Sequence, residues 1–438
     1  MTSVEYVTHA SLCFRHDGRS LLTDPFYWFD PLAASVMQHY PPRRLEPSDL
    51  GRIDFLYSSH IHPDHSHPDT LARLRPQVQT VLLPAQRPGL WQRYEGLGFT
   101  DVRRLQNGQT EKLSDALEVT SYWSDPVDTC LVVDMGGTVA LHCNDCLPTP
   151  ELASRIGDRH PIDTAFMLYT SAQDLYPFLL PRPHVELARL AGLREQAFLH
   201  DQIERVRRLR PRRVVPYSMT MTWFQPEQRW LNGCHRLLPA QFAEAVEKAV
   251  PGTVCEVVQP GDVVERDGVR QAIQVDYWGR TLEEYLANIE RHCSGPPFQP
   301  GRVGDVLERL QSSLQRFVAG IPGFTDLYAF LRRGVGLTVE GVDGPATFFL
   351  DLATRRVQQG EGWPVLEVAV PASIVASMLD GHYDPYSLLF LHRARFKLNS
   401  LQRLTPEAES NLYLVTFMLI LCDNPGDFVS SATVALPA

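Results

Sequence analysis

The sequence lacks any apolar run long enough to cross a membrane. Its longest candidate, residues 412–422, is about half of the ~20 residues that a spanning helix needs. The first residues, MTSVEYVTHASLCFRHDG, contain no cationic segment followed by an apolar one, so we expect no secretory signal. We therefore expect a cytoplasmic protein without a membrane partner.

The sequence also lacks a surplus of positive charge. Its 41 Lys and Arg residues stand against 51 Asp and Glu, which gives a formal net charge of −10. A protein that coats a phosphate backbone needs the opposite sign, so we expect no nucleic-acid partner. The 44% hydrophobic and 21% charged content are ordinary for a globular protein, and no internal repeat or low-complexity tract is present.

Cysteines do not form a disulfide framework. Eight are scattered over 438 residues, which favours reduced thiols in a cytoplasmic protein. Cys143 and Cys146 form a C-x-x-C, but no second pair stands at the spacing of a zinc ribbon. Coincidence is therefore favoured over a redox dithiol or an additional metal ligand.

One stretch, SSHIHPDHSHP at residues 58–68, gathers metal-binding side chains. It follows the apolar run 53–57, which predicts a buried strand that ends at an irregular loop. Imidazole and carboxylate ligands suit zinc, iron or manganese, and the pattern leaves the metal open. The alternative is a polar loop without a metal. The candidate ligands are His60, His62, Asp64, His65 and His67.

The order of the predicted elements indicates the fold class. Residues 3–26 alternate as paired strands with an Asp-Gly turn, and the strand 21–24 ends on Asp24. Residues 26–51, rich in aromatic residues and proline, are expected to form a loop over the site rather than regular structure. The mixture predicts an α/β layered sandwich with its site on one sheet edge. Further strands are expected at 53–57, 80–83, 102–105, 117–122, 130–134, 138–143, 164–170 and 214–216, and helices at 68–74, 88–97 and 185–209.

A change of composition predicts a second domain. Ser294-Gly295-Pro296-Pro297, followed by Pro300-Gly301, is the clearest boundary in the chain. We expect a metal-binding catalytic domain at 1–293 and a smaller α+β domain at 294–438. The second domain weakly resembles sterol-carrier-like domains, which enclose an apolar cavity. Because it has few clustered polar groups, packing or homo-oligomer formation is favoured over catalysis.

The histidine motif carries a family resemblance. H-x-H-x-D-H after a strand, together with T-H-A-S at 8–11 and L-L-T-D-P at 21–25, resembles the metallo-β-lactamase fold over roughly residues 3–220. The branch it resembles contains ascorbate-6-phosphate lactonase and the phospholipase D that acts on N-acylethanolamine phospholipids. The resemblance implies an αββα sandwich. It places His60 and His62 on a first metal, Asp64 and His65 on a second, and Asp145 between the two.

The same resemblance implies supporting roles and shows departures. Asp24 would orient a ligating histidine through its other ring nitrogen, and His9 would line the entrance. Where the fold normally has a third ligand histidine, Trp123 and its neighbours stand instead. Asp125 is the nearest replacement carboxylate, and Asp128 is a weaker choice.

The last ligand position also departs from the usual pattern. It falls at V-P-Y-S, where Tyr217 or Ser218 replaces the usual histidine. His184, His200 and His235 are candidates for the missing ligand, and none is favoured strongly. A dizinc hydrolase of this fold needs both histidines to poise a bridging hydroxide, so these losses weaken that interpretation.

The altered pattern resembles the metallo-β-lactamase-like part of CMP-N-acetylneuraminate hydroxylase. The shared motifs are T-D-P-F at 23–26, S-H-x-H-x-D-H at 59–65, N-D-C at 144–146, and V-P-Y-S at 215–218. The Rieske domain of that enzyme has no counterpart, because the sequence contains no C-x-H…C-x-x-H pair. An oxygenase of this kind would need an external electron donor.

Three functions follow from these patterns. The leading one is a metal-dependent monooxygenase, with one or two iron ions, that hydroxylates or oxidises a small metabolite in a biosynthetic pathway. Its catalytic carboxylates would be Asp64, Asp145 and Asp125, in a dry pocket formed by the 26–40 loop and residues 223–224. The alternative is a dinuclear zinc or manganese hydrolase of a phosphodiester, lactone or amide. The third is a degenerate binding protein.

Two further histidines receive structural interpretations. His67 precedes Pro68, and an exposed helix-capping role is favoured over contact with a substrate. His142 would face away from Asp145 by strand alternation, so a core position is favoured.

Overall fold

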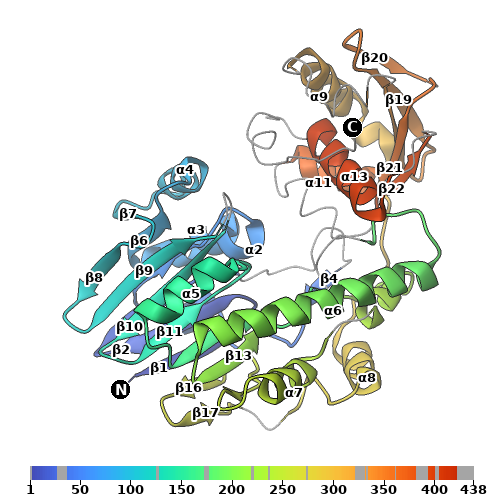
Figure 1. Ribbon diagram of the computed structural model, residues 1–438. Helices are drawn as coiled ribbons and strands as arrows, with labels where there is room; N and C mark the ends of the chain where they lie inside the picture. Colours follow the sequence, from blue (N-terminus) through green and yellow to red (C-terminus); the bar gives the residue numbers. More distant parts are fainter. Residues whose placement is uncertain are drawn as a thin grey trace.

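The computed structural model in Figure 1 describes most of the chain. The described residues are 2–26, 37–124, 128–171, 177–218, 221–234, 237–272, 275–320, 331, 334–360, 362–380, 393–399 and 404–421. Within them, no helix combines the length and the apolar character needed to cross a membrane.

An eight-stranded mixed sheet contains the N-terminal strands. Its order is β17-β16-β1-β2-β3-β5-β6-β7, and the pairs from β3 to β7 are parallel. The strands are β1 (Ser3–Thr8), β2 (Ser11–His16), β3 (Arg19–Thr23), β5 (Ile53–Tyr57), β6 (Val78–Pro84), β7 (Val102–Leu105), β16 (Val263–Glu265) and β17 (Gly268–Arg270).

A seven-stranded sheet packs against the first one. Its order is β15-β13-β12-β11-β10-β9-β8, with parallel pairing from β11 to β15. Because parallel strands end at the same edge, β11, β12 and β13 all deliver their last residues to one side of the molecule. The strands are β8 (Thr110–Ser114), β9 (Leu117–Trp123), β10 (Thr129–Met135), β11 (Val139–His142), β12 (Thr164–Leu168), β13 (Arg213–Tyr217) and β15 (Val254–Cys255).

Side-chain alternation produces four layers. In β10, Leu131 and Val133 join the core between the sheets, whereas Cys130 and Val132 pack with α5 (Pro150–Arg159) and α6 (His184–Leu209). On the outer face of the other sheet, α3 (Pro68–Leu74) and α4 (Pro88–Gly96) cover a separate apolar cluster. Figure 1 shows these helices flanking the sheets, and the predicted αββα sandwich is confirmed.

Two local predictions were wrong. Within the expected 26–51 loop, β4 (Met37–His39) pairs with β14 (Met221–Trp223), and a 3-10 helix forms at Pro47–Leu50. Periodicity could not predict a strand whose partner lies about 180 residues away. Within the histidine motif, α2 (Pro63–Ser66) forms a short helical turn, because a proline suits the first turn of a helix.

The C-terminal part forms a five-stranded sheet of order β20-β19-β18-β21-β22. Its core cluster continues into Leu179, Leu180 and Trp223 of the N-terminal part. The ion pair between Arg182 and Glu409 joins the two parts at 2.9 Å. The boundary between 293 and 294 stays a prediction. The elements are α9 (Leu307–Gly320), β18 (Val335–Glu340), β19 (Ala346–Asp351), β20 (Arg356–Gln359), β21 (Leu366–Pro371), α11 (Ala372–Leu379), β22 (Arg395–Leu398) and α13 (Pro406–Leu421).

Helices α7 (Pro239–Ala249) and α8 (Leu282–His292) complete the N-terminal part. Phe242 and Val246 of α7 and Tyr285 and Ile289 of α8 pack in the cluster that also holds α5 and α6. These helices therefore extend the layer that covers the seven-stranded sheet.

Candidate metal centre

The candidate ligands come from strand ends at one edge of the sandwich. His9 lies between β1 and β2, Asp24 follows β3, the histidine motif follows β5, and Asp145 follows β11. At this edge the backbone repeatedly takes the left-handed region, which non-glycine residues rarely adopt. The φ angles are 47° at His9, 41° at Asp24, 45° at Asn144 and 71° at Ser218. Such strain often accompanies functional sites.

A first group of ligand atoms comes from His60, His62 and Asp145. One ligand atom from each lies within 4.8 Å of the others. Nε2 of His60 and Nδ1 of His62 are 2.9 Å apart, and Nδ1 of His60 is 2.9 Å from the hydroxyl of Ser59. This serine contact leaves the opposite ring nitrogen of His60 facing His62.

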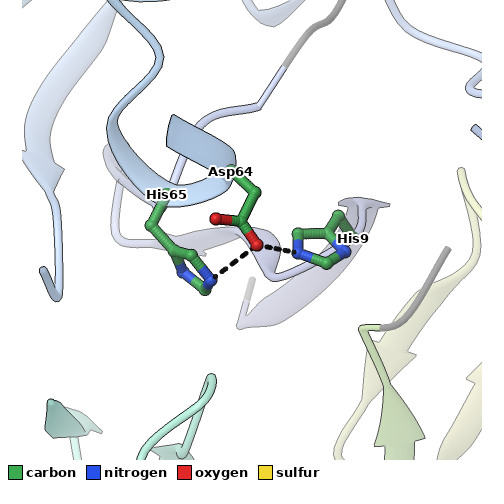
Figure 2. Close-up of side chains that lie close together, drawn as sticks. All are labelled: His9, Asp64 and His65. Atoms are coloured by element: carbon green, nitrogen blue, oxygen red, sulfur yellow. Dashed lines mark hydrogen bonds and ion pairs between the residues drawn. The ribbon is translucent and has the colours of Figure 1, made fainter. Parts of the chain in front are cut away.

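A second group comes from His9, Asp64 and His65, shown in Figure 2. One carboxylate oxygen of Asp64 lies between the two imidazoles, 3.1 Å from Nε2 of His9 and 3.4 Å from Nε2 of His65. His9 is fully buried, so the expectation that it lines the entrance was wrong. The tight β1–β2 connection turns it inward. Only its position beside Ala10-Ser11 in T-H-A-S hinted at this in the sequence.

His65 joins the two groups. Its Nε2 lies 3.2 Å from Oδ2 of Asp145, which belongs to the first group, and its ring packs against that of His60 with centroids 4.1 Å apart. Asp145 is thus in reach of both groups.

The donor set fits a metal cofactor. Ligands bound at ~2.1 Å to one ion lie ~3 to 3.5 Å apart, which matches the spacings among these imidazole and carboxylate atoms. Nδ1 of His9 is buried and has no hydrogen-bond partner in the described part of the chain. Two imidazole nitrogens that approach to 2.9 Å share either a proton or an ion. The site therefore suits one or two metal ions.

The electrostatics favour neutral His60 and ionised carboxylates. Burial, together with the charges of His65 and His62, holds the pKa of His60 well below its usual value. Burial alone would lower the pKa of His65, but Asp145 and Asp64 outweigh it and raise that pKa. Burial raises the pKa of Asp64 and of Asp145, and the His65 charge more than reverses this in both. A metal ion would take the place of the His65 proton.

Asp24 contacts two histidines. Its Oδ2 is 2.7 Å from Nε2 of His142 and 3.4 Å from Nδ1 of His65, while its Oδ1 accepts from the backbone N–H of Ser59 at 2.7 Å. Burial would raise the pKa of Asp24, but the hydrogen bond with His142 and the charge of the neighbouring His65 outweigh it and lower that pKa. The core interpretation of His142 was incomplete: it is buried, but both ring nitrogens are hydrogen-bonded, Nδ1 with the Tyr217 hydroxyl.

The remaining ligand positions have different outcomes. Asp125 lies outside the described residues. Asp128 Oδ1 is 3.7 Å from Nδ1 of His60, and Trp123 is half-buried at the end of β9. At the closing strand, the Tyr217 hydroxyl bonds to Asn144 and His142 rather than standing free.

Among the described residues, the other candidate histidines do not join either group. His184 stacks on Trp230, His200 is exposed, and His235 lies outside the described residues. His67 caps α3, where its side chain accepts from the backbone N–H of Thr70. Capping was therefore confirmed, but His67 is 7% exposed rather than open to solvent, because Phe26 packs beside it.

The expected aromatic pocket is described only in part. Phe26 is buried, with its ring 5.6 Å from that of His9. Trp223 belongs to the same apolar cluster as Phe26, whereas Phe224 packs in the cluster of α5 and α6. Residues 27–36 of this loop lie outside the described residues.

Residues 3–144 match the Beta-lactamase superfamily domain. This part of the chain has the metallo-β-lactamase fold. The match includes the histidine motif, His9 and Asp24, and it ends just before Asp145.

Three relatives extend the comparison. Cytidine monophosphate-N-acetylneuraminic acid hydroxylase of Danio rerio is 22% identical over 60% of this chain and 46% of its own length. A Mycobacterium tuberculosis (strain ATCC 25618 / H37Rv) protein, provisionally named a Rieske 2Fe-2S iron-sulfur protein, is 29% identical over 96% of this chain and 84% of its own length. The 4-amino-L-phenylalanyl-[CmlP-peptidyl-carrier-protein] 3-hydroxylase of Streptomyces venezuelae is 37% identical over 24% of this chain and 20% of its own length. The chain thus spans about half the length of the first of these relatives.

Proposed function

We propose that this chain is an iron-dependent oxygenase that hydroxylates or oxidises a small metabolite. The observation that carries the proposal is the ligand set, in which histidines and carboxylates alternate around His65 while Tyr217 occupies the closing position. Two relatives are named as hydroxylases, which supports the same reaction class.

The choice of iron rests on the balance of oxygen and nitrogen donors. Asp64 and Asp145 provide hard oxygen ligands beside the imidazoles, and this mixture suits iron in oxygen chemistry. Asp125 would add a third carboxylate where hydrolases of the fold use a histidine. Bound iron would supply the redox chemistry for O2 activation, while Phe26 would limit the access of water beside His9.

The proposed reaction requires electrons from outside the chain. The sequence contains no C-x-H…C-x-x-H pair of the Rieske type, so a separate donor protein is the simplest source. In this proposal, residues 1–293 carry the reaction. Residues 294–438 pack against them and serve docking of substrate or of a second subunit.

Metal analysis tests the proposal. The protein would be loaded anaerobically with Fe²⁺, freed of excess metal, and examined for iron content and for ultraviolet–visible changes on exposure to O2. We expect one or two iron ions per chain, and reductant-dependent O2 consumption. The Asp145→Asn variant should lose both the bound iron and the O2 consumption. The Asp115→Asn variant, changed at an exposed surface position, should keep both. Stoichiometric zinc that excludes iron after this loading would contradict the proposal.

The second candidate is a metal-dependent hydrolase. The complete H-x-H-x-D-H motif and the superfamily match of residues 3–144 favour it. A hydrolase would cleave phosphodiester, lactone or amide substrates with zinc or manganese in the absence of O2. Anaerobic turnover of such substrates would decide for this function over the first.

A further inference from the structure

We propose that the Tyr217 hydroxyl is a positioning group that couples the two groups of metal ligands. It stands at the closing position where a ligand would be expected, but it acts through hydrogen bonds to Asn144 and His142. This inference rests on the proposed metal centre and adds a function for a residue outside the ligand set.

The first connection reaches Asp145. The backbone N–H of Asn144 donates to the Tyr217 oxygen at 2.6 Å. Asn144 holds a left-handed φ of 45°, and its side chain donates to the carbonyl of Thr129 at 2.6 Å and accepts from the backbone N–H of Cys146. These bonds fix the turn that presents Asp145 to His60 and His62.

The second connection reaches His65. The Tyr217 hydroxyl lies 2.8 Å from Nδ1 of His142, whose Nε2 lies 2.7 Å from Oδ2 of Asp24. The same Asp24 oxygen lies 3.4 Å from Nδ1 of His65. Tyr217 therefore reaches the second group through two intervening side chains, all of them buried.

The proton positions along this series of hydrogen bonds follow from the acceptors. The Tyr217 oxygen already accepts from Asn144, so its own proton goes to Nδ1 of His142. His142 then donates from Nε2 to the Asp24 carboxylate, which can only accept. Burial raises the pKa of Tyr217 well above its usual value, so the phenol keeps its proton.

This arrangement sets the tautomer of a ligand. Nδ1 of His65 lies 3.4 Å from the Asp24 carboxylate, a contact that favours a proton on Nδ1 and leaves the lone pair of His65 on Nε2, the atom that faces Asp64 and Asp145. Loss of the Tyr217 proton donor would free His142 to rotate or change tautomer. It would also leave the Asn144 N–H without its partner.

Cobalt binding provides the test. Apo-protein would be titrated with Co²⁺, which reports on each site through its visible absorption, and the parent is expected to bind two ions. Tyr217→Phe keeps the ring and removes the hydroxyl, and we expect about tenfold weaker binding at both sites. His142→Phe should weaken only the site that contains His65, because the Asn144 bond is retained. The exchangeable, paramagnetically shifted signal of the His65 Nδ1 proton should change in both variants.

Tyr122→Phe is the matched control. Tyr122 also makes a tyrosine–histidine hydrogen bond, partly buried, with Nε2 of His160 at 2.8 Å, but it lies outside the candidate centre. Its loss should lower the thermal midpoint without changing Co²⁺ affinity. Parent-like Co²⁺ binding by Tyr217→Phe would overturn the inference. A parent protein that binds no Co²⁺ would contradict the metal centre itself. If the parent binds Co²⁺ but its iron-loaded form shows no O2-dependent turnover, only the oxygenase function would be contradicted.

Discussion

The hydroxyl of Thr129 donates to the backbone carbonyl of Ser59 at 2.9 Å and accepts from the hydroxyl of Tyr57. Thr129 begins β10 of one sheet, whereas Tyr57 ends β5 of the other. A single side chain thus ties the two sheets together directly beside His60.

Thr129→Val tests this connection. The substitution preserves shape but leaves the Ser59 carbonyl and the Tyr57 hydroxyl buried without their partner, so unfolding should become easier by about 2 kcal/mol. Urea denaturation measures the change. Thr110→Val removes a part-buried hydrogen bond between the hydroxyls of Thr110 and Thr120, and it should lower the unfolding free energy by less than half as much. Equal effects of the two substitutions would contradict the proposed importance of the tie.

Arg93 of α4 is predicted to hold the histidine motif in place. One guanidinium nitrogen lies 2.7 Å from the carbonyl of Ile61 and 2.7 Å from the hydroxyl of Ser66. In Arg93→Ala, backbone amides of residues 61–66 should exchange with solvent faster, and Fe²⁺ affinity should fall about tenfold. Arg104→Ala removes a guanidinium that stacks on Trp91 and should change neither measurement. Unchanged exchange in Arg93→Ala would refute this role.

His67 is predicted to act as a helix cap and not as a ligand. Its ring accepts from the Thr70 N–H, and burial lowers its pKa to about 4, so it is neutral at pH 7. His67→Ala should destabilise the protein by about 1 kcal/mol, whereas His67→Asn should restore most of this loss. Iron content should stay at the parent value in both variants. Loss of iron with intact stability would instead identify His67 as a ligand.

Asp54 should make stability depend on pH. Burial raises its pKa, but the Ser20 N–H and the Arg19 guanidinium outweigh this and lower it below the usual 3.8. Because the folded pKa lies below the unfolded one, its stabilisation is present above pH 3.8 and is lost as pH falls through the folded value. The difference in unfolding free energy between parent and Asp54→Asn should shrink between pH 6 and ~pH 3. A difference that grows on acidification would contradict the assignment.

Metal removal should weaken the fold. Asp64 and Asp145 face each other across His65, and without an ion their mutual repulsion is offset only by the imidazoles. A metal ion at a free concentration one hundred times its dissociation constant should raise the unfolding free energy by about 2.7 kcal/mol. Thermal unfolding with Fe²⁺ and then with a chelator measures this shift. His62→Ala should reduce it, and an identical midpoint with and without metal in the parent would rule it out.

Sequence alone determined the features that depend on neighbouring residues. The H-x-H-x-D-H spacing after an apolar strand identified the motif at 58–68. The order of strands and helices predicted an α/β layered sandwich, and the family resemblance implied the αββα arrangement that the structure confirms. These patterns suffice because strand and helix periodicities are local, and because the motif residues share one short loop.

Tertiary structure decided which distant residues meet. The pairing of β1 with β2 brought His9 to Asp64 and His65, in the second group of ligands. The end of β13 placed Tyr217 against Asn144 and His142. Strand alternation correctly buried His142 but gave no information on Asp24, which lies 118 residues away. Such contacts depend on the register of non-local strands and on strained turns, and neither is encoded in a local pattern.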